Sequence, residues 1–314
     1  MTRSGATIRF YFIDVFASDP LTGNPLALVP DADELTEPQM RAVAREFNQS
    51  ETTFLLQPRL PGAAWRLRSF TPTGAEVAGA GHNALGAWLW LAHSGRLPGD
   101  RGDFAQEIGD AVLPVRLSRD PGHPVSVSMD QSPPRFGAVI ADRTELDELA
   151  AALGLSREDL VPDPPAQVVG TGASHLLAAV RDRAAVDRSR PRAADLAAVL
   201  SPTGGEGCYL YTLEPAGNDA SAYARFFNPA FGISEDPATG TAAGPLAALL
   251  RRTGKTADGT IIIEQGRALG RPSHIRVTVA GQHVTVTGTG LIVAEGTLRL
   301  RHDEYSAAEP SAPA

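Results

Sequence analysis

Cysteine is almost absent from this sequence of 314 residues, which contains only Cys208. A single thiol excludes an internal disulfide framework, and it excludes any mechanism that needs two thiols. This cysteine usage predicts a cytoplasmic protein. The opening residues, MTRSGATIRFYFIDVF, have no apolar segment followed by a cleavage site, so we expect no signal peptide.

Long apolar runs and an excess of positive charge are also missing. The longest apolar candidate, residues 77–92, is interrupted by His82 and Asn83, which favours a buried helix over a membrane span of about 18 residues. The formal net charge of -8 has the wrong sign for a protein that binds nucleic acid by neutralising phosphates. We therefore expect neither a membrane nor a nucleic acid as a partner.

Motifs for metals and common cofactors are lacking as well. The seven histidines show no H-E-x-x-H or other paired-ligand spacing, and no G-x-S-x-G elbow occurs. GAGHNA at residues 79–84 does fit G-x-G-x-x-A, but residues 71–78 before it are polar instead of forming an apolar strand, which argues against a dinucleotide site. We therefore expect no metal and no cofactor.

Aromatic residues make up only 6% of the chain, whereas it contains 31 glycines and 25 prolines, a composition that favours a sheet-rich protein with many tight turns. The length allows two domains of about 150 residues. The Pro-rich stretch MDQSPP predicts a boundary between an N-terminal domain, 1–130, and a C-terminal domain, 131–305, whose last strand could return to the first. The Ala-, Pro- and Ser-rich tail, 306–314, is expected to be disordered.

An internal repeat is the strongest positive signal in the sequence. RSFTP at residues 68–72 recurs as RFFNP at 225–229, and each copy precedes a helix of equal length that begins and ends at glycine, residues 81–95 and 240–254. Both helices are apolar nearly all round, which is typical of buried helices. The repeat therefore predicts two pseudo-symmetric half-barrel domains, each with several strands around one central helix.

Local patterns near the start predict further elements. Residues 8–16 and 26–29 are typical of two strands of a hairpin. Thr36 and Gln39 form a capping box that begins a helix, and a strand at 53–56 follows that helix.

Three segments carry more polar residues than packing requires: NQSETTF, GAGHNALG and EDPATGT. Taken singly, Glu51 is typical of a solvated carboxylate, His82 of a helix cap, and Asp236 of a turn. The repeat changes this interpretation, because it places His82 and Thr241 at equivalent first positions of two helices whose N-termini would converge. Such helix ends bind carboxylates and stabilise enolate-like charge, so a carboxylate held between them can act as a base.

Together these motifs resemble the phenazine-biosynthesis isomerase (PhzF-like) family. The matching segments are NQSETTF, R-x-F-T-P with a later GH-x-x-L-G, RFFNPAFGISEDPATGTA, IDVFASDPLTGNPLALV, TGASHLLA and GRPS, which run from about Phe10 to about Leu300. The resemblance implies an α+β fold of the diaminopimelate-epimerase type, in which a curved, mostly antiparallel sheet surrounds a helix in each domain. It also implies a homodimer.

The resemblance implies a cofactor-independent isomerase that moves a proton between carbons of a small anionic substrate. The catalytic Glu of the family falls on Glu51, its active-site His on His82 and its Asp on Asp236. Thr241 stands where the family has Ser, which keeps the hydroxyl and adds a methyl group. Asn83 also departs from the usual residues after GH, which leaves the substrate open between a cyclic amino acid or dienamine and a metabolite repaired in primary metabolism.

The substrate carboxylate is expected on N–H groups at Gly81-His82 and Gly240-Thr241, at the starts of the two repeated helices. The related epimerases and proline racemases use two cysteines, a route that the lone Cys208 excludes. Cys208 itself is predicted to be a buried strand residue. The alternative function is a non-catalytic small-molecule-binding protein of the same fold, but such a protein would not need the base that Glu51 provides.

Overall fold

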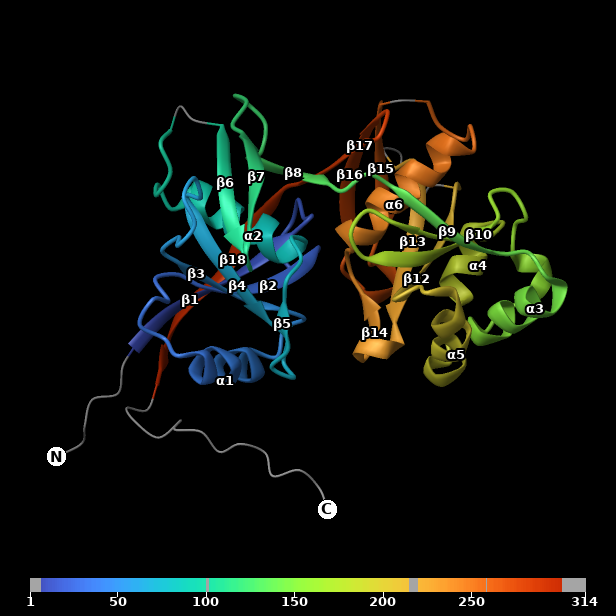
Figure 1. Ribbon diagram of the computed structural model, residues 1–314, viewed down its shortest axis with the longest axis horizontal. Coiled ribbons are helices and arrows are strands. Elements are labelled where there is room, and N and C mark those ends of the chain that lie inside the picture. The colour runs from blue at the N-terminus through green and yellow to red at the C-terminus, as the bar shows by residue number, and fades with distance from the viewer. Residues whose placement is uncertain (1–6, 100–101, 215–219, 258, 301–314) are drawn as a thin grey trace, which may run out of the picture.

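Two buried helices, α2 (His82–His93) and α6 (Gly240–Arg252), form the centres of the two halves of the molecule (Figure 1). Nearly every residue of both helices is buried, as their apolar sequences predict. Each helix is followed by a glycine with positive φ, Gly95 at 71° and Gly254 at 70°, a conformation that glycine adopts without steric cost. The predicted helix ends at these glycines are therefore confirmed.

The computed structural model describes residues 7–99, 102–214, 220–257 and 259–300, so the predicted tail at 306–314 lies outside the described residues. Beside α2, the first half contains β1 (Thr7–Val15), β2 (Asn24–Val29), α1 (Glu37–Phe47), β3 (Thr52–Leu56), β4 (Trp65–Phe70), β5 (Glu76–Val77), β6 (Asp103–Ile108), β7 (Ala111–Ser118) and β8 (Ser126–Gln131).

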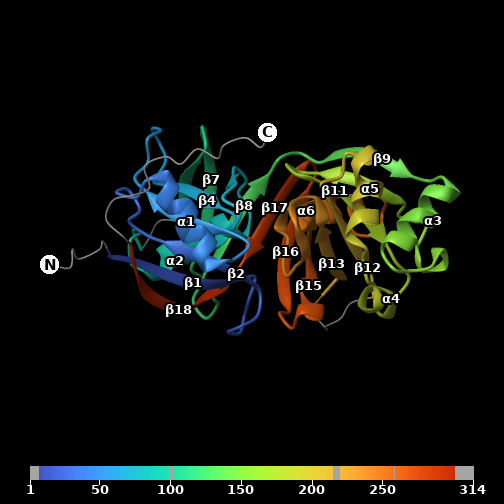
Figure 2. The same ribbon diagram turned by 90° about the horizontal axis from the view of Figure 1, so that it is seen from below.

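Beside α6, the second half contains more helices, three of which, α3, α4 and α5, lie on its outer side (Figures 1 and 2). Its elements are β9 (Arg135–Ile140), α3 (Arg143–Ala152), η1 (Arg157–Asp159), β10 (Ala166–Gly170), β11 (Ser174–Ala179), α4 (Arg183–Arg188), α5 (Ala193–Thr203), β12 (Gly207–Thr212), β13 (Ala222–Asn228), η2 (Pro229–Phe231), β14 (Ile233–Asp236), β15 (Gly259–Gln265), η3 (Arg267–Leu269), β16 (Ser273–Ala280) and β17 (His283–Gly288). The last strand, β18 (Gly290–Arg299), lies in the first half beside β1.

The two halves repeat one strand order with the same strand directions. In the first half β1, β2, β3, β4, β6 and β7 pair in that order, with β2–β3 and β4–β6 parallel and the other pairs antiparallel. In the second half β10, β11, β12, β13, β15 and β16 repeat the series, with β11–β12 and β13–β15 parallel. The predicted α+β fold of two pseudo-symmetric, mostly antiparallel half-barrels is therefore confirmed.

Strands also join the halves to one another. β8 pairs with β7 of the first half and with β17 of the second, and Figure 1 shows it running between the two halves. β18 returns from the second half to pair along the whole length of β1. The proposed boundary after residue 130 falls inside β8 and stays a prediction.

The local predictions agree with the structure to within two residues at each end. The hairpin strands are β1 and β2, and the strand after the first helix is β3. At the start of α1 the N–H group of Thr36 donates to Gln39 Oε1 over 2.9 Å, and the predicted capping box between these two residues is confirmed. Cys208 is buried in β12, as predicted. Within the described part of the chain, no helix is long and apolar enough to cross a membrane.

The core of the first half requires a close approach of α2 to the sheet. A Cβ atom on Gly86 would lie 2.6 Å from Leu26 Cδ2 and 2.8 Å from Val15 Cγ2, both within fully buried side chains. We expect Gly86→Ala to lower the free energy of unfolding by about 1–3 kcal/mol, although Ala favours a helix over Gly by about 1 kcal/mol. Denaturant unfolding measures the change.

Gly99→Ala is the matched control, because a Cβ atom there would meet nothing within 4 Å. A Gly86→Ala protein as stable as the wild type would show that α2 does not pack this closely.

Candidate active site

A cavity of about 700 Å³ lies where residues of both halves meet at the starts of α2 and α6. All six residues singled out from the sequence line it: Glu51, Gly81, His82, Asp236, Gly240 and Thr241. The first three come from the first half and the others from the second. The repeat thus brings the two helix N-termini to one cavity, while the chemical roles of these residues stay predictions.

Glu51 directly precedes β3, so its backbone is held by the strand pairing that begins at Thr52. Its Oε2 atom is buried and has no hydrogen-bond partner among the described residues. Burial and, to a smaller extent, the negative charge of Asp236 raise the pKa of Glu51 to about 8. A carboxyl group with this pKa can both accept and release a proton near neutral pH.

Asp236 ends β14 and is buried, with 8% of its surface exposed. Asn24 Nδ2 donates to Asp236 Oδ1 over 2.9 Å, and the Thr239 hydroxyl donates to Oδ2. Burial raises the pKa of Asp236 to about 6 against the opposing effect of these hydrogen bonds. Because the charge of Asp236 also acts on Glu51, the two carboxyl groups titrate as a coupled pair.

A buried polar network fixes the backbone around Asp236. Gln265 Nε2 donates to the Asp236 carbonyl oxygen over 2.6 Å, and Gln265 Oε1 accepts from the N–H group of Thr239 and from the Tyr209 hydroxyl. Sequence reasoning missed Asn24, Gln265 and Tyr209 as supports of the site. Asn24 lies inside the motif IDVFASDPLTGNPLALV, which was a signal for it, whereas nothing in the sequence around Gln265 or Tyr209 indicated this contact.

His82 is the first residue of α2 and is 9% exposed. Burial lowers the pKa of its imidazole to about 4, so the ring is neutral at pH 7. Its Nε2 atom lies 3.4 Å from Ser50 Oγ, a contact that the sequence analysis also missed. A neutral ring at this place can donate or accept a hydrogen bond but carries no charge.

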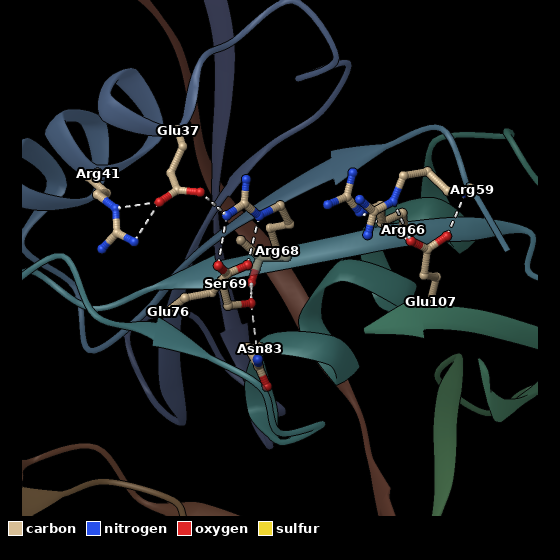
Figure 3. A network of polar contacts seen from close by, with 10 residues as sticks. Glu37, Arg41, Arg59, Arg66, Arg68, Ser69, Glu76, Asn83 and Glu107 are labelled. Carbon is tan, nitrogen blue, oxygen red and sulfur yellow. Dashed lines mark hydrogen bonds and ion pairs between the residues drawn. The ribbon is translucent and has the colours of Figure 1, made fainter. Parts of the chain in front are cut away.

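The start of α2 is organised by Asn83. Its Oδ1 atom accepts the N–H group of Gly81 over 2.7 Å, and its Nδ2 atom donates to Ser69 Oγ over 3.0 Å, a contact drawn in Figure 3. The N–H group of Gly81 therefore already has an acceptor within the protein, so it is less suited than expected to bind a substrate carboxylate. The N–H group of His82, the next residue, is the helix-end donor that remains at the cavity.

The start of α6 presents the second set of donors. The N–H groups of Ala242 and Ala243 both donate to the carbonyl oxygen of Thr239. Gly240 and Thr241, which precede them, are the helix-end N–H donors at the cavity. The carbonyl oxygen of Gly240 accepts from Gln131 Nε2 over 3.0 Å, which fixes this end of the helix.

Matching ion pairs hold the segments that lead into the two helices. Arg68 donates to both carboxylate oxygens of Glu76 over 2.7 Å each, as Figure 3 shows, and its guanidinium lies over the Phe70 ring. Arg225 binds Glu235 in the same bidentate manner over 2.9 and 2.7 Å. Because bidentate Arg–carboxylate pairs are geometrically specific, each pair fixes a short strand just before a helix start.

The site itself is not symmetric, although the halves are. The strand registers align Glu51 with Gly207, and they align Asp236 with Val77. A Cβ atom on Gly207 would lie 2.5 Å from the Phe226 ring, so the second half has no room for a side chain where the first half has Glu51. Each half thus supplies one carboxylate, from a different position.

Comparison with known proteins agrees with this architecture. The sequence pattern of the family described as phenazine biosynthesis-like protein matches residues 13–296. A trans-2,3-dihydro-3-hydroxyanthranilate isomerase of Pseudomonas chlororaphis is 36% identical over 299 residues, which cover 93% of this chain and 99% of the relative. Similarity therefore extends over both halves and over every segment of the cavity.

Solved structures extend the comparison to the fold. The phenazine biosynthesis protein of the PhzF family from Bacillus anthracis has a TM-score of 0.86 at 28% identity, covering 94% of this chain and 100% of its own. A hydroxyproline epimerase from Agrobacterium vitis has a TM-score of 0.59 at 13% identity, covering 94% and 93%, which is a likeness of fold alone.

The raised pKa of Glu51 predicts how stability depends on pH. Above its ordinary value of 4.5 the unfolded carboxyl group loses its proton, whereas the folded one keeps it up to about pH 8. The folded state then binds more protons, so this group lowers the free energy of unfolding as pH rises through that window. Glu51→Gln removes the effect, and we expect the variant to gain on the order of 1–3 kcal/mol over the wild type between pH 5 and pH 8.

Urea unfolding at both pH values measures this gain. Glu46→Gln is the control, because Glu46 is exposed on α1 and lies outside the cavity. A Glu51→Gln gain that is equal at pH 5 and pH 8 would contradict the raised pKa.

Proposed function

The chain belongs to the phenazine biosynthesis-like family and is an isomerase, and from this premise we propose that it moves one proton between two carbon atoms of a small carboxylate. Glu51 is the proposed acid–base group, and no cofactor takes part. The observation that carries the proposal is the buried Glu51 Oε2 atom, which has no hydrogen-bond partner among the described residues and stands at a cavity lined by two helix N-termini.

The helix ends provide the proposed seat for the substrate carboxylate. Its oxygens would accept from the N–H groups of His82, Gly240 and Thr241, where the helix dipoles also favour negative charge. These dipoles are already oriented before the reaction begins, so they can stabilise the delocalised anion that forms when carbon loses a proton. The net charge of -8 disfavours the approach of an anionic substrate, and the positive ends of the two helices offset this effect at the cavity.

The proposed proton transfer runs in two steps through the same carboxyl group. Ionised Glu51 takes a proton from one carbon, and the electron pair of that C–H bond passes into the conjugated system of the substrate. Protonated Glu51 then gives the same proton to a second carbon on the same face, which restores the base. Asp236 and the neutral His82 would hold the heteroatoms of the substrate by hydrogen bonds during both steps.

The substrate class follows by analogy with the relative whose name gives one. A trans-2,3-dihydro-3-hydroxyanthranilate isomerase acts on a cyclic carboxylate with an amino group, and we propose a substrate of that kind. The cavity offers it apolar walls, including Phe226 and Ile233, beside the polar groups. Thr241 has one methyl group more than the Ser of the family, which leaves less room beside the substrate carboxylate. A related cyclic amino acid is therefore a second candidate.

A non-catalytic binding protein would not benefit from an unpaired buried carboxyl group, because such a group lowers the free energy of unfolding without adding a contact.

We propose further that the chain works in the cytoplasm as a homodimer. Sedimentation equilibrium at micromolar concentration is then expected to give twice the chain mass of 33.0 kDa. A mass of one chain would contradict the dimer and leave the chemistry untouched.

Replacement of Glu51 by Gln separates binding from turnover. Gln keeps the shape and a polar contact but cannot take a proton, so turnover of trans-2,3-dihydro-3-hydroxyanthranilate should fall by about 10²–10⁴-fold while binding survives. Steady-state kinetics and calorimetric titration measure the two quantities.

Glu206→Gln is the matched control, because Glu206 lines the same cavity but is exposed and binds the N–H group of Ser174. It should change turnover only a few-fold. Wild-type turnover in Glu51→Gln would rule Glu51 out as the base.

A further inference from the structure

His175 is a buried titratable residue at the cavity to which the reaction above assigns no role. It lies on β11, is 3% exposed, and belongs to the second half. Its ring stands edge-on to Phe226, with centroids 4.9 Å apart and an interplanar angle of 82°. Burial and this aromatic contact leave the imidazole little freedom to rotate.

The two ring nitrogens of His175 have different surroundings. Nε2 lies 3.3 Å from the hydroxyl oxygen of Thr241, the second residue of α6. Nδ1 is buried and has no hydrogen-bond partner among the described residues. The ring is neutral at pH 7, because burial lowers its pKa to about 4, and it therefore carries a single N–H group.

The position of that proton follows from what each nitrogen can contact. A buried N–H group without an acceptor is rarer in proteins than a buried acceptor without a donor. The tautomer with its proton on Nε2 leaves only a lone pair unpartnered at Nδ1, and it makes Nε2–H a donor to Thr241 Oγ1. The hydroxyl of Thr241 then cannot donate back to His175, and its own proton must point elsewhere.

We propose that His175 is a positioning residue that holds the Thr241 oxygen and thereby directs the Thr241 O–H group into the cavity, toward the carboxylate of the substrate. Thr241 then adds a side-chain donor to the helix-end N–H groups at the same seat. This part rests on the function proposed above, because it assumes a carboxylate at the start of α6.

The first half of the molecule shows that this arrangement is a specialisation. The strand registers align His175 with Leu26, a fully buried apolar residue that packs in the core. An apolar side chain therefore satisfies the fold at this place, and packing alone does not require an imidazole. Leu is for that reason the natural replacement at position 175, and Gln is the replacement that can still donate.

Nitrogen NMR of protein labelled at its histidine rings tests the positioning without any ligand. At pH 7 we expect the His175 ring, identified by its loss in His175→Gln, to carry its proton on Nε2. Thr241→Val should shift the Nε2 resonance, whereas Thr253→Val near the other end of α6 should leave it unchanged. A proton on Nδ1, or an Nε2 resonance that ignores Thr241→Val, would overturn the proposal.

Binding of anthranilate and of its carboxamide tests the consequence for the substrate. The wild type should prefer the carboxylate, and His175→Leu should reduce this preference about ten-fold by lost orientation of one donor to a charged group. His175→Gln should retain most of it. Equal weakening of both compounds by His175→Leu would mean a structural role and would also overturn the proposal. A wild type without any preference would instead refute the carboxylate seat, leaving the NMR result to decide on His175.

Discussion

The N–H groups at the starts of two buried helices are the constraint on which this structure depends. An α-helix leaves its first N–H groups without intrahelical partners, and burial makes that state costly unless another acceptor is found. In this chain both helix starts open on one cavity, where protein groups satisfy part of the need: Asn83 accepts from Gly81, and Thr239 accepts from two N–H groups of α6. The helix-end donors that remain can bind an anion, and the proposed function rests on that property.

The second feature is the asymmetry of the cavity within a fold of two similar halves. The halves share their strand order, their central helix and a bidentate Arg–Glu pair before each helix. They differ at the positions that face the cavity: Glu51 aligns with Gly207, where the Phe226 ring fills the space. One half thus has a carboxylate where the other half has the Phe226 ring, an arrangement that suits a single base acting on one face of a substrate.

Much of this could be predicted from the sequence, because the signals were local or repeated. The two apolar helices, the glycines that end them and the repeated RSFTP and RFFNP segments predict the duplicated fold, and the polar motifs predict which residues line the cavity. Contacts between segments far apart in the chain could not be predicted. The bonds from Asn24 to Asp236 and from His175 to Thr241 depend on strand registers that no local pattern specifies, and the capture of the Gly81 N–H group depends on one rotamer of Asn83.

The central claim is that one buried carboxyl group both removes and returns the proton. Turnover of trans-2,3-dihydro-3-hydroxyanthranilate in D₂O, followed by mass spectrometry of the product formed in the first turnovers, tests it most directly. A proton sheltered on Glu51 between the two steps predicts product with clearly less than one deuterium at the newly protonated carbon. Complete deuterium incorporation from the first turnover, with no retention of the original proton, would contradict the account.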